Sequence, residues 1–145
     1  MTQRRLKLAA RARTVLIAGL GVTNLLFGVY CIVRPTTLAE LAGVTSPTAS
    51  VLGELRAVYG GLVGALGLAL LAILFRKLDR PEQVLLGVLF AGLSLGRLVS
   101  IVVDGPSGFT LSALGFEGGA AAVLWWNPTP ADGVRAAGTR PTGSP

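Results

Sequence analysis

The chain has 145 residues, of which 52% are hydrophobic, with a mean hydropathy of +0.68 and a formal net charge of +6. This composition indicates one membrane domain, and it argues against a nucleic-acid binder because the basic residues lie between apolar stretches instead of on one exposed face. The chain has no His and a single cysteine, Cys31, which excludes Cys/His metal sites, disulfide frameworks and His-based catalysis within one chain.

A basic leader, residues 1–13, precedes an apolar segment that we expect to be a retained first membrane span, Thr14 to Val33. A secretory signal also begins with basic residues, but its apolar core is shorter, and no small-x-small cleavage site follows here. Tyr30 directly before Cys31 also argues against lipoprotein processing. Cys31 is therefore expected to be a small apolar residue of a helix.

Four apolar segments are long enough to cross a hydrocarbon layer about 30 Å thick as helices that rise 1.5 Å per residue. Helix-breaking or capping residues separate them, namely Pro35, Ser46 and Pro47, Asp79 to Pro81, and Gly105 and Pro106. The predicted spans are residues 14–33, 51–75, 84–103 and 109–126. The expected fold is all-α, a four-helix transmembrane bundle over residues 14–126, followed by a disordered cytoplasmic tail, residues 127–145.

The loop charges predict the orientation, because Lys and Arg beside short spans are retained in the cytoplasm. One side holds nearly all of them: Arg4, Arg5, Lys7, Arg11, Arg13, Arg76, Lys77, Arg80, Arg135 and Arg140. Only Arg34 falls on the other side. Both termini are therefore expected to be cytoplasmic, and Trp125, Trp126 and Tyr30 fit aromatic belts at the two interfaces.

The longer outer loop contains the sequence TTLAELAGV, in which Thr37 and Glu40 have the spacing of a capping box. This pattern predicts a short helix on the outer membrane surface. Two interpretations stay open, a lid over the polar residues described below and, preferred here, a connector whose apolar side rests on lipid.

Small residues recur four positions apart in three of the predicted spans. This spacing lets helix backbones approach closely, which matters in lipid because the hydrophobic effect does not drive helices together there. We predict that these glycines pack within the bundle; in the alternative, one stripe faces outward toward another protein. The pairs are Gly60 and Gly64, Gly92 and Gly96, and Gly115 and Gly119.

Ionisable residues inside apolar spans are costly and usually have partners. Arg97 lies about 9 Å from the outer end of the third span, and Glu117 about 12 Å from the outer end of the fourth. Their similar depth predicts a buried ion pair. Ser100 and Asp104 follow Arg97 at spacings of three and four residues and therefore share its helix face.

Arg56 aligns with Gly60 on the second span, which places it on the expected packing seam. We expect it to meet Asp104 or Glu117 across the bundle, with the hydroxyl of Tyr59 at a similar level. Glu54 lies on the other side of the helix from Arg56, so these two are not expected to pair. Asn24 in the first span is expected to form an interhelical hydrogen bond.

Three roles are open for these candidate residues: an ion-pair network that sets helix register, a site for an anionic lipid headgroup or carboxylate, or a proton or solute route through Glu117. No catalytic, metal or cofactor motif is present, so a non-catalytic protein without a cofactor is expected. The candidates are Glu54, Arg56, Tyr59, Arg97, Ser100, Asp104 and Glu117.

The stretches GELRAVYGG, Gly53 to Gly61, and GLSLGRLVSIVVDG, Gly92 to Gly105, precede Glu117 in an apolar fourth segment. Together with Asn24 and Pro35, this pattern resembles a bacterial family of four-helix membrane proteins filed as a domain of unknown function. The resemblance implies a four-helix bundle in the bacterial inner (plasma) membrane, and it implies no reaction.

The function expected from these observations is a non-catalytic accessory or stabilising subunit of a larger inner-membrane assembly. So short a bundle has little room for a transport path. The alternative is a small membrane protein that binds or carries an anionic lipid or other hydrophobic solute. The expected partners are membrane lipids and other integral membrane subunits, such as those of a transport or lipid-handling complex, and not nucleic acid.

Overall fold

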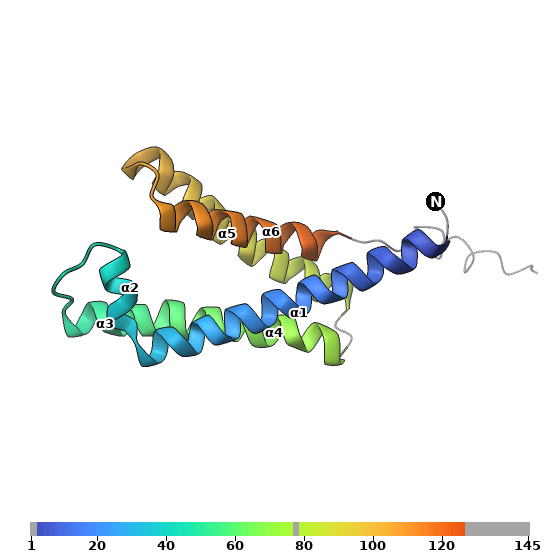
Figure 1. Ribbon diagram of the computed structural model, residues 1–145, viewed down its shortest axis with the longest axis horizontal. Coiled ribbons are helices and arrows are strands. Elements are labelled where there is room, and N and C mark those ends of the chain that lie inside the picture. Colours follow the sequence, from blue (N-terminus) through green and yellow to red (C-terminus); the bar gives the residue numbers. More distant parts are fainter. Residues whose placement is uncertain (1–2, 77–78, 127–145) are drawn as a thin grey trace, which may run out of the picture.

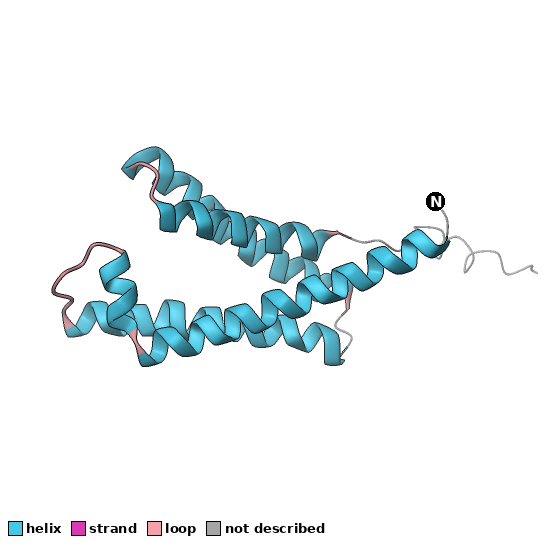
Figure 2. Ribbon diagram, viewed as in Figure 1, coloured by secondary structure: helices cyan, strands magenta, loops and turns pink. Residues whose placement is uncertain are grey.

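The computed structural model describes residues 3–76 and 79–126, and the regular structure in this part of the chain is entirely helical (Figure 2). The helices are α1 (Gln3–Val33), α2 (Pro35–Leu41), α3 (Ala49–Leu55), the π-helical η1 (Arg56–Leu62), α4 (Val63–Arg76), α5 (Arg80–Asp104) and α6 (Gly108–Trp125). Helices α3, η1 and α4 follow one another without a break.

Three helices are long and apolar enough to cross a membrane: Gln3–Val33, the continuous Ala49–Arg76, and Arg80–Asp104. They contain the first three predicted spans and extend them by a few residues, except that α1 continues from Thr14 back to Gln3 through the predicted leader. The fourth predicted span is also one helix, α6, but its 18 residues are not among the three. The predicted disordered tail, residues 127–145, lies outside the described residues.

The long helices form two pairs. Helix α1 packs along η1 and α4, and α5 packs along α6. Figure 1 shows the two pairs close together at the end that holds the start of α5 and the end of α6, and further apart toward α2 and α3. Fewer contacts join the two pairs to each other than join the helices within a pair.

The first pair is joined through glycines. A Cβ atom added to Gly28 of α1 would lie 2.6 Å from Gly64 Cα and 2.8 Å from Gly60 O, distances that real Cβ atoms do not reach. A Cβ atom at Gly67 would lie 2.5 Å from the backbone nitrogen of Leu25. The prediction that Gly60 and Gly64 form a packing seam is therefore confirmed.

The same prediction is wrong for the second pair. No atom of another element lies within 4 Å of a Cβ added to Gly92 or Gly96 on α5, or to Gly115 or Gly119 on α6. Equal spacing along a helix places glycines on one face, but it does not determine whether a neighbouring helix covers that face.

A hydrophobic core fills the end at which the two pairs meet. All four long helices contribute to it, and Phe90, Ile17, Leu70 and Leu124 are its largest side chains with an exposed fraction below 2%. The complete buried cluster is Ile17, Leu66, Leu70, Ile73, Phe90, Ala120, Ala121 and Leu124. This packing holds one end of the molecule together, while the other end stays open for the site described below.

The loop helix α2 exists, but it begins differently from the predicted capping box. Pro35 occupies its first turn and no side chain caps it, so Thr37 lies inside the helix. Helix α2 buries Leu38 and Ala39 while Leu41 is 66% exposed, and it packs against α1 and α3.

The remaining helix starts have clear local causes. Thr48, two positions after the predicted cap at Ser46, accepts a hydrogen bond from Val51 N and starts α3. Asp79 forms a capping box with Glu82 at the start of α5. Gly105 has a φ of +91° after α5, a conformation that favours glycine, and the side chain of Ser107 caps α6. The short turn between α5 and α6 makes these helices an antiparallel hairpin.

Candidate functional site

A cavity of about 560 Å³ lies between the two helix pairs, on the open side of the hydrophobic core. Its volume is within the range that small-molecule sites occupy. The polar residues on its wall are Thr23, Asn24, Tyr59, Arg97, Ser100, Ser112 and Glu117, and the aromatic ones besides Tyr59 are Phe27, Phe90, Phe109 and Phe116. All four long helices therefore contribute to one mostly apolar cavity with a small polar group on its wall.

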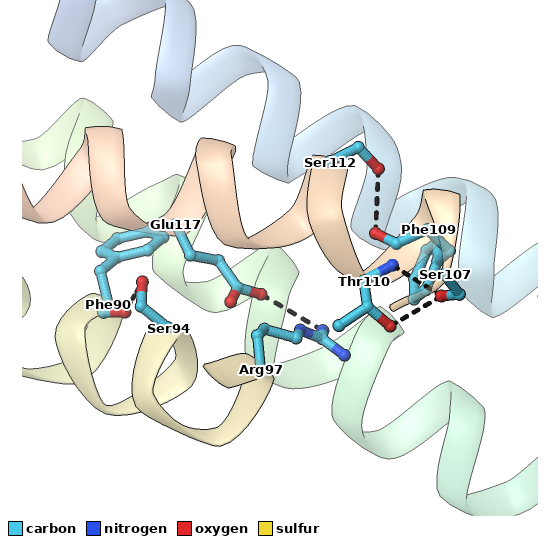
Figure 3. A network of polar contacts seen from close by, with 8 residues as sticks. All are labelled: Phe90, Ser94, Arg97, Ser107, Phe109, Thr110, Ser112 and Glu117. Atoms are coloured by element: carbon cyan, nitrogen blue, oxygen red, sulfur yellow. Dashed lines mark hydrogen bonds and ion pairs between the residues drawn. The ribbon is translucent and has the colours of Figure 1, made fainter. Parts of the chain in front are cut away.

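The predicted ion pair is present in this wall. Arg97 Nη2 of α5 donates to Glu117 Oε1 of α6 across 3.2 Å, as Figure 3 shows. The side chains are only 20% and 11% exposed. The antiparallel hairpin brings these positions to the same depth, which is the geometry that their distances from the span ends predicted.

Glu117 uses only one of its two carboxylate oxygens. Oε1 accepts from Arg97, whereas Oε2 is buried and has no hydrogen-bond partner among the described residues. Leaving a buried polar atom without a partner costs about 1 to 3 kcal/mol, and more when the group is charged. The carboxylate therefore has unused hydrogen-bonding capacity at the cavity wall.

Two aromatic rings flank the Arg97 guanidinium. Its central carbon lies 5.5 Å from the centroid of the Phe109 ring and 6.0 Å from that of Tyr59, which are cation–π distances. The two ring centroids are 6.5 Å apart. Since Tyr59 belongs to the other helix pair, the Arg97 side chain is one of the groups that connect the pairs.

Tyr59 lies in η1, the π-helical part of the second long helix. A π-helical turn holds more residues than an α-helical turn, and such turns are frequent at functional sites. Tyr59, with Val58 and Leu62 of the same turn, lines the cavity, while Gly60 contacts α1. The segment thus serves the packing seam and the cavity wall at once.

Arg56 does not meet Asp104 or Glu117, so that expectation was wrong. Its side chain is on the α1 side, as its alignment with Gly60 predicted, and its Nε donates to Ile32 O at 3.2 Å. The physical reason is that the helix face shared by Arg56 and Gly60 packs on α1 at Ile32, while the two helix pairs lie further apart at the end of α2 and α3 (Figure 1).

Asp104 and Ser100 form a local contact at the end of α5. Ser100 Oγ donates to Asp104 Oδ2 at 3.1 Å, which agrees with their predicted common face. Asp104 is exposed, and so is Glu54 on α3. Of the seven candidate residues, the cavity therefore brings together Tyr59, Arg97, Ser100 and Glu117, and it does not include Glu54, Arg56 or Asp104.

Asn24 was expected to bond another helix, and this expectation was also wrong. Its Nδ2 donates to Leu20 O of its own helix at 2.8 Å. The residue is 4% exposed and lies on the cavity wall. An amide can satisfy part of its hydrogen bonding within one turn, so it needs no interhelical partner here.

The sequence analysis missed a second polar cluster, at the closed end of the molecule. Arg80 Nη1 donates to Leu124 O at 2.8 Å and Arg80 Nη2 to Trp125 O at 2.5 Å. Arg13 Nε donates to Trp126 O at 2.8 Å. Arg13 of α1 and Arg80 of α5 thus bind the last carbonyl groups of α6, which have no partner inside that helix.

A third residue completes this closed-end cluster. Arg13 Nη2 also donates to Gln83 Oε1 at 2.6 Å, which connects α1 to the first turns of α5. From the sequence, Arg13 and Arg80 were interpreted only as markers of the cytoplasmic side. One feature of the sequence could have indicated these contacts. The last turn of α6 contains no basic residue, so its free carbonyl groups attract cations from neighbouring segments.

The described residues contain no group of three or more His, Cys, Asp or Glu side chains that could hold a metal ion. Cys31 is a fully buried free cysteine in α1.

Comparison with curated proteins gives no match, and comparison with solved structures gives none either. The model of one family, Domain of unknown function (DUF4345), matches residues 12–127. This match covers α1 from residue 12 onward, the other three long helices and both motifs of the sequence analysis, and the chain therefore belongs to the family described as Domain of unknown function (DUF4345).

Proposed function

We propose that this protein binds a lipid-like hydrophobic solute in the cavity between its two helix pairs, with the polar head of the solute at Arg97. The observation that carries this proposal is the cavity of about 560 Å³ with a largely buried guanidinium and a buried, partnerless carboxylate oxygen on its wall. A mostly apolar cavity with a few convergent polar groups is the usual form of a binding site for small molecules.

The proposal includes a topology in which the chain crosses a bacterial inner membrane four times, with both termini in the cytoplasm. Helix α6 runs antiparallel to α5 along its length, and Figure 1 places the start of α1 and the end of α6 at the same end of the molecule. The basic residues Arg13, Arg76 and Arg80 are at this end and Arg34 is at the other, as the retention of cations in the cytoplasm requires.

Binding would be tested with the full chain in lipid nanodiscs and a fluorescent acyl probe. Wild type is expected to bind the probe saturably, and Arg97→Gln is expected to weaken binding at least tenfold, which corresponds to about 1.4 kcal/mol. The matched control is Arg56→Gln, because Arg56 lies in the same part of the bundle but not on the cavity wall. Equal binding by both variants would contradict the proposal.

A second candidate function is the one first expected, an accessory or stabilising subunit of a larger membrane assembly. The observation that favours it is an exposed stripe of small residues on α6: Gly108, Gly115, Gly119 and Ala122. These residues share one helix face, and nothing in the described chain packs on the two central glycines. Such a face suits the close approach of a helix from another membrane protein.

Mild detergent extraction with cross-linking would separate the two functions. A subunit is expected to yield a defined partner in constant ratio, and Gly115→Leu is expected to remove that partner. Gly53→Leu serves as the control, because Gly53 also has open space around it but lies on α3. A chain that stays free of a stoichiometric partner would contradict this second candidate.

A further inference from the structure

The polar wall of the cavity carries no net charge, because Arg97 and Glu117 compensate each other at 3.2 Å. A ligand head that reaches Arg97 is therefore also close to a carboxylate. Two like charges about 4 Å apart repel by about 4 kcal/mol at the effective dielectric constant of a protein surface. An anionic head would gain from Arg97 and lose to Glu117, so the pair does not favour an anion.

One carboxylate oxygen of Glu117 can also accept a hydrogen bond from a ligand. Its Oε2 is buried and has no partner among the described residues, and an ionised carboxylate only accepts hydrogen bonds. Glu117 lines the cavity, and the last torsion of a Glu side chain is soft, so rotation about it can reorient Oε2 to meet a ligand there. A ligand N–H or O–H at that place would satisfy it.

Arg97 can donate a hydrogen bond to a ligand acceptor that lies beside this ligand donor. The guanidinium has five N–H groups in a planar fork, and the ion pair uses one of them through Nη2. Figure 3 shows the fork extending past the carboxylate, away from Phe90 and Ser94. A carbonyl oxygen placed there would accept from the fork while a neighbouring donor reaches Glu117.

We propose, on the basis of the binding function above, that the cavity selects an uncharged acyl lipid whose head places a carbonyl oxygen next to an N–H or O–H donor. Fatty amides and monoacylglycerols have this chemistry. The apolar part of the wall, with Phe27, Leu93 and Phe116, holds the hydrocarbon chain.

The test uses the full chain in nanodiscs and four ligands with the same chain, which compete against one fluorescent acyl probe. Oleamide and monoolein carry both a carbonyl and a donor, methyl oleate carries the carbonyl alone, and oleate carries a negative charge. Wild type is expected to bind oleamide or monoolein at least tenfold more tightly than methyl oleate and oleate, because a site with a buried acceptor rejects an analogue that lacks the donor. Whichever of oleamide and monoolein binds more tightly identifies the head group, an amide or a glyceride, that the cavity prefers.

Glu117→Gln gives a second readout, because it removes the negative charge and keeps the size of the side chain. The variant leaves Arg97 uncompensated, so oleate is expected to become the tightest of the four ligands. Glu54→Gln, an exposed position away from the cavity, is expected to keep the wild-type order. If Glu117→Gln does not fold, the order in which wild type binds the four ligands still tests the proposal.

The outcomes separate this inference from the function on which it rests. If wild type binds oleate most tightly and Arg97→Gln loses that binding, the binding function stands and the uncharged head is wrong. If methyl oleate binds as tightly as oleamide and monoolein, the donor requirement is wrong. If no ligand depends on Arg97, both proposals fail.

Discussion

The two helix pairs of this molecule are held together in opposite ways. Helices α1 and α4 meet backbone to backbone at Gly28 and Gly64, whereas a Cβ added to the equally spaced glycines of α5 and α6 would meet no atom within 4 Å. The second pair uses side chains instead, with the ion pair between Arg97 and Glu117 on the cavity wall. The comparison teaches that a small-residue stripe permits close packing, and that the neighbouring helix decides whether it occurs.

The largest expected effect comes from breaking the ion pair of the second helix pair. Arg97→Ala or Glu117→Ala alone is expected to lower the free energy of unfolding by about 3 to 5 kcal/mol, because each leaves a buried charge without its mate. The double variant is expected to lose less than the sum of the two. The free energies of unfolding of wild type, the two single variants and the double variant are measured in detergent micelles by titration with a denaturing detergent. Additive losses would show that the two residues do not stabilise each other.

The next effect tests the glycine seam of the first pair. Gly28→Ala is expected to lower the free energy of unfolding by about 1 to 3 kcal/mol, since its Cβ would lie 2.6 Å from Gly64 Cα and the backbone must move apart. The matched control is Gly19→Ala on the same helix, where no atom lies within 4 Å. Thermal unfolding in the same detergent compares the two. A seam variant as stable as its control would mean that the helices do not pack this closely.

A smaller effect is expected at the closed end of the second pair, where Arg80 of α5 binds the end of α6. Arg80→Gln removes the hydrogen bonds to Leu124 O and Trp125 O, and it is expected to cost about 1 kcal/mol because Arg80 is exposed and water replaces part of the loss. Hydrogen exchange should rise in the last turn of α6 and stay unchanged in α1 near Gly28. Arg76→Gln is the control, a basic residue at the end of α4 without such bonds to α6. Unchanged exchange in α6 would contradict a role of Arg80 in closing this end.

The smallest effect is expected at the open glycines. Gly115→Ala should leave the stability of the isolated protein unchanged or raise it by up to about 1 kcal/mol, because alanine favours a helix and nothing occupies the space around it. The same unfolding titration measures this change. A clear destabilisation would show that α6 packs against something at Gly115, and the contrast between the two pairs would then disappear.

Much of the fold could be predicted from the sequence because apolar length and helix-breaking residues act locally. The helix ends at Val33, Arg76 and Asp104 lie within a residue of the predicted span ends. The Arg97–Glu117 contact followed for the same reason, since a short turn fixes the relative depth of two neighbouring helices. Whether α6 is a fourth crossing stays a prediction.

The rest depended on how the pairs are placed relative to each other, which no local pattern contains. Arg56 was expected to reach α5 or α6, but the separation of the pairs leaves Ile32 O as its partner. The cavity arises from the same separation, so the sequence named Arg97 and Glu117 without indicating the space beside them. Arg13 and Arg80 were missed as contacts because their partners are backbone carbonyls, which every sequence contains.

Helix α1 has one further consequence for the behaviour of the protein. It has 31 residues and is about 46 Å long, against a hydrocarbon layer of about 30 Å, and Figure 1 shows its first turns projecting beyond the other helices. The projecting part, with Arg4, Arg5, Lys7 and Arg11, is continuous with the turns that carry Asn24 on the cavity wall. Because α1 is unbroken from these turns to Val33, a change in its tilt moves the basic turns and the Asn24 part of the cavity wall together.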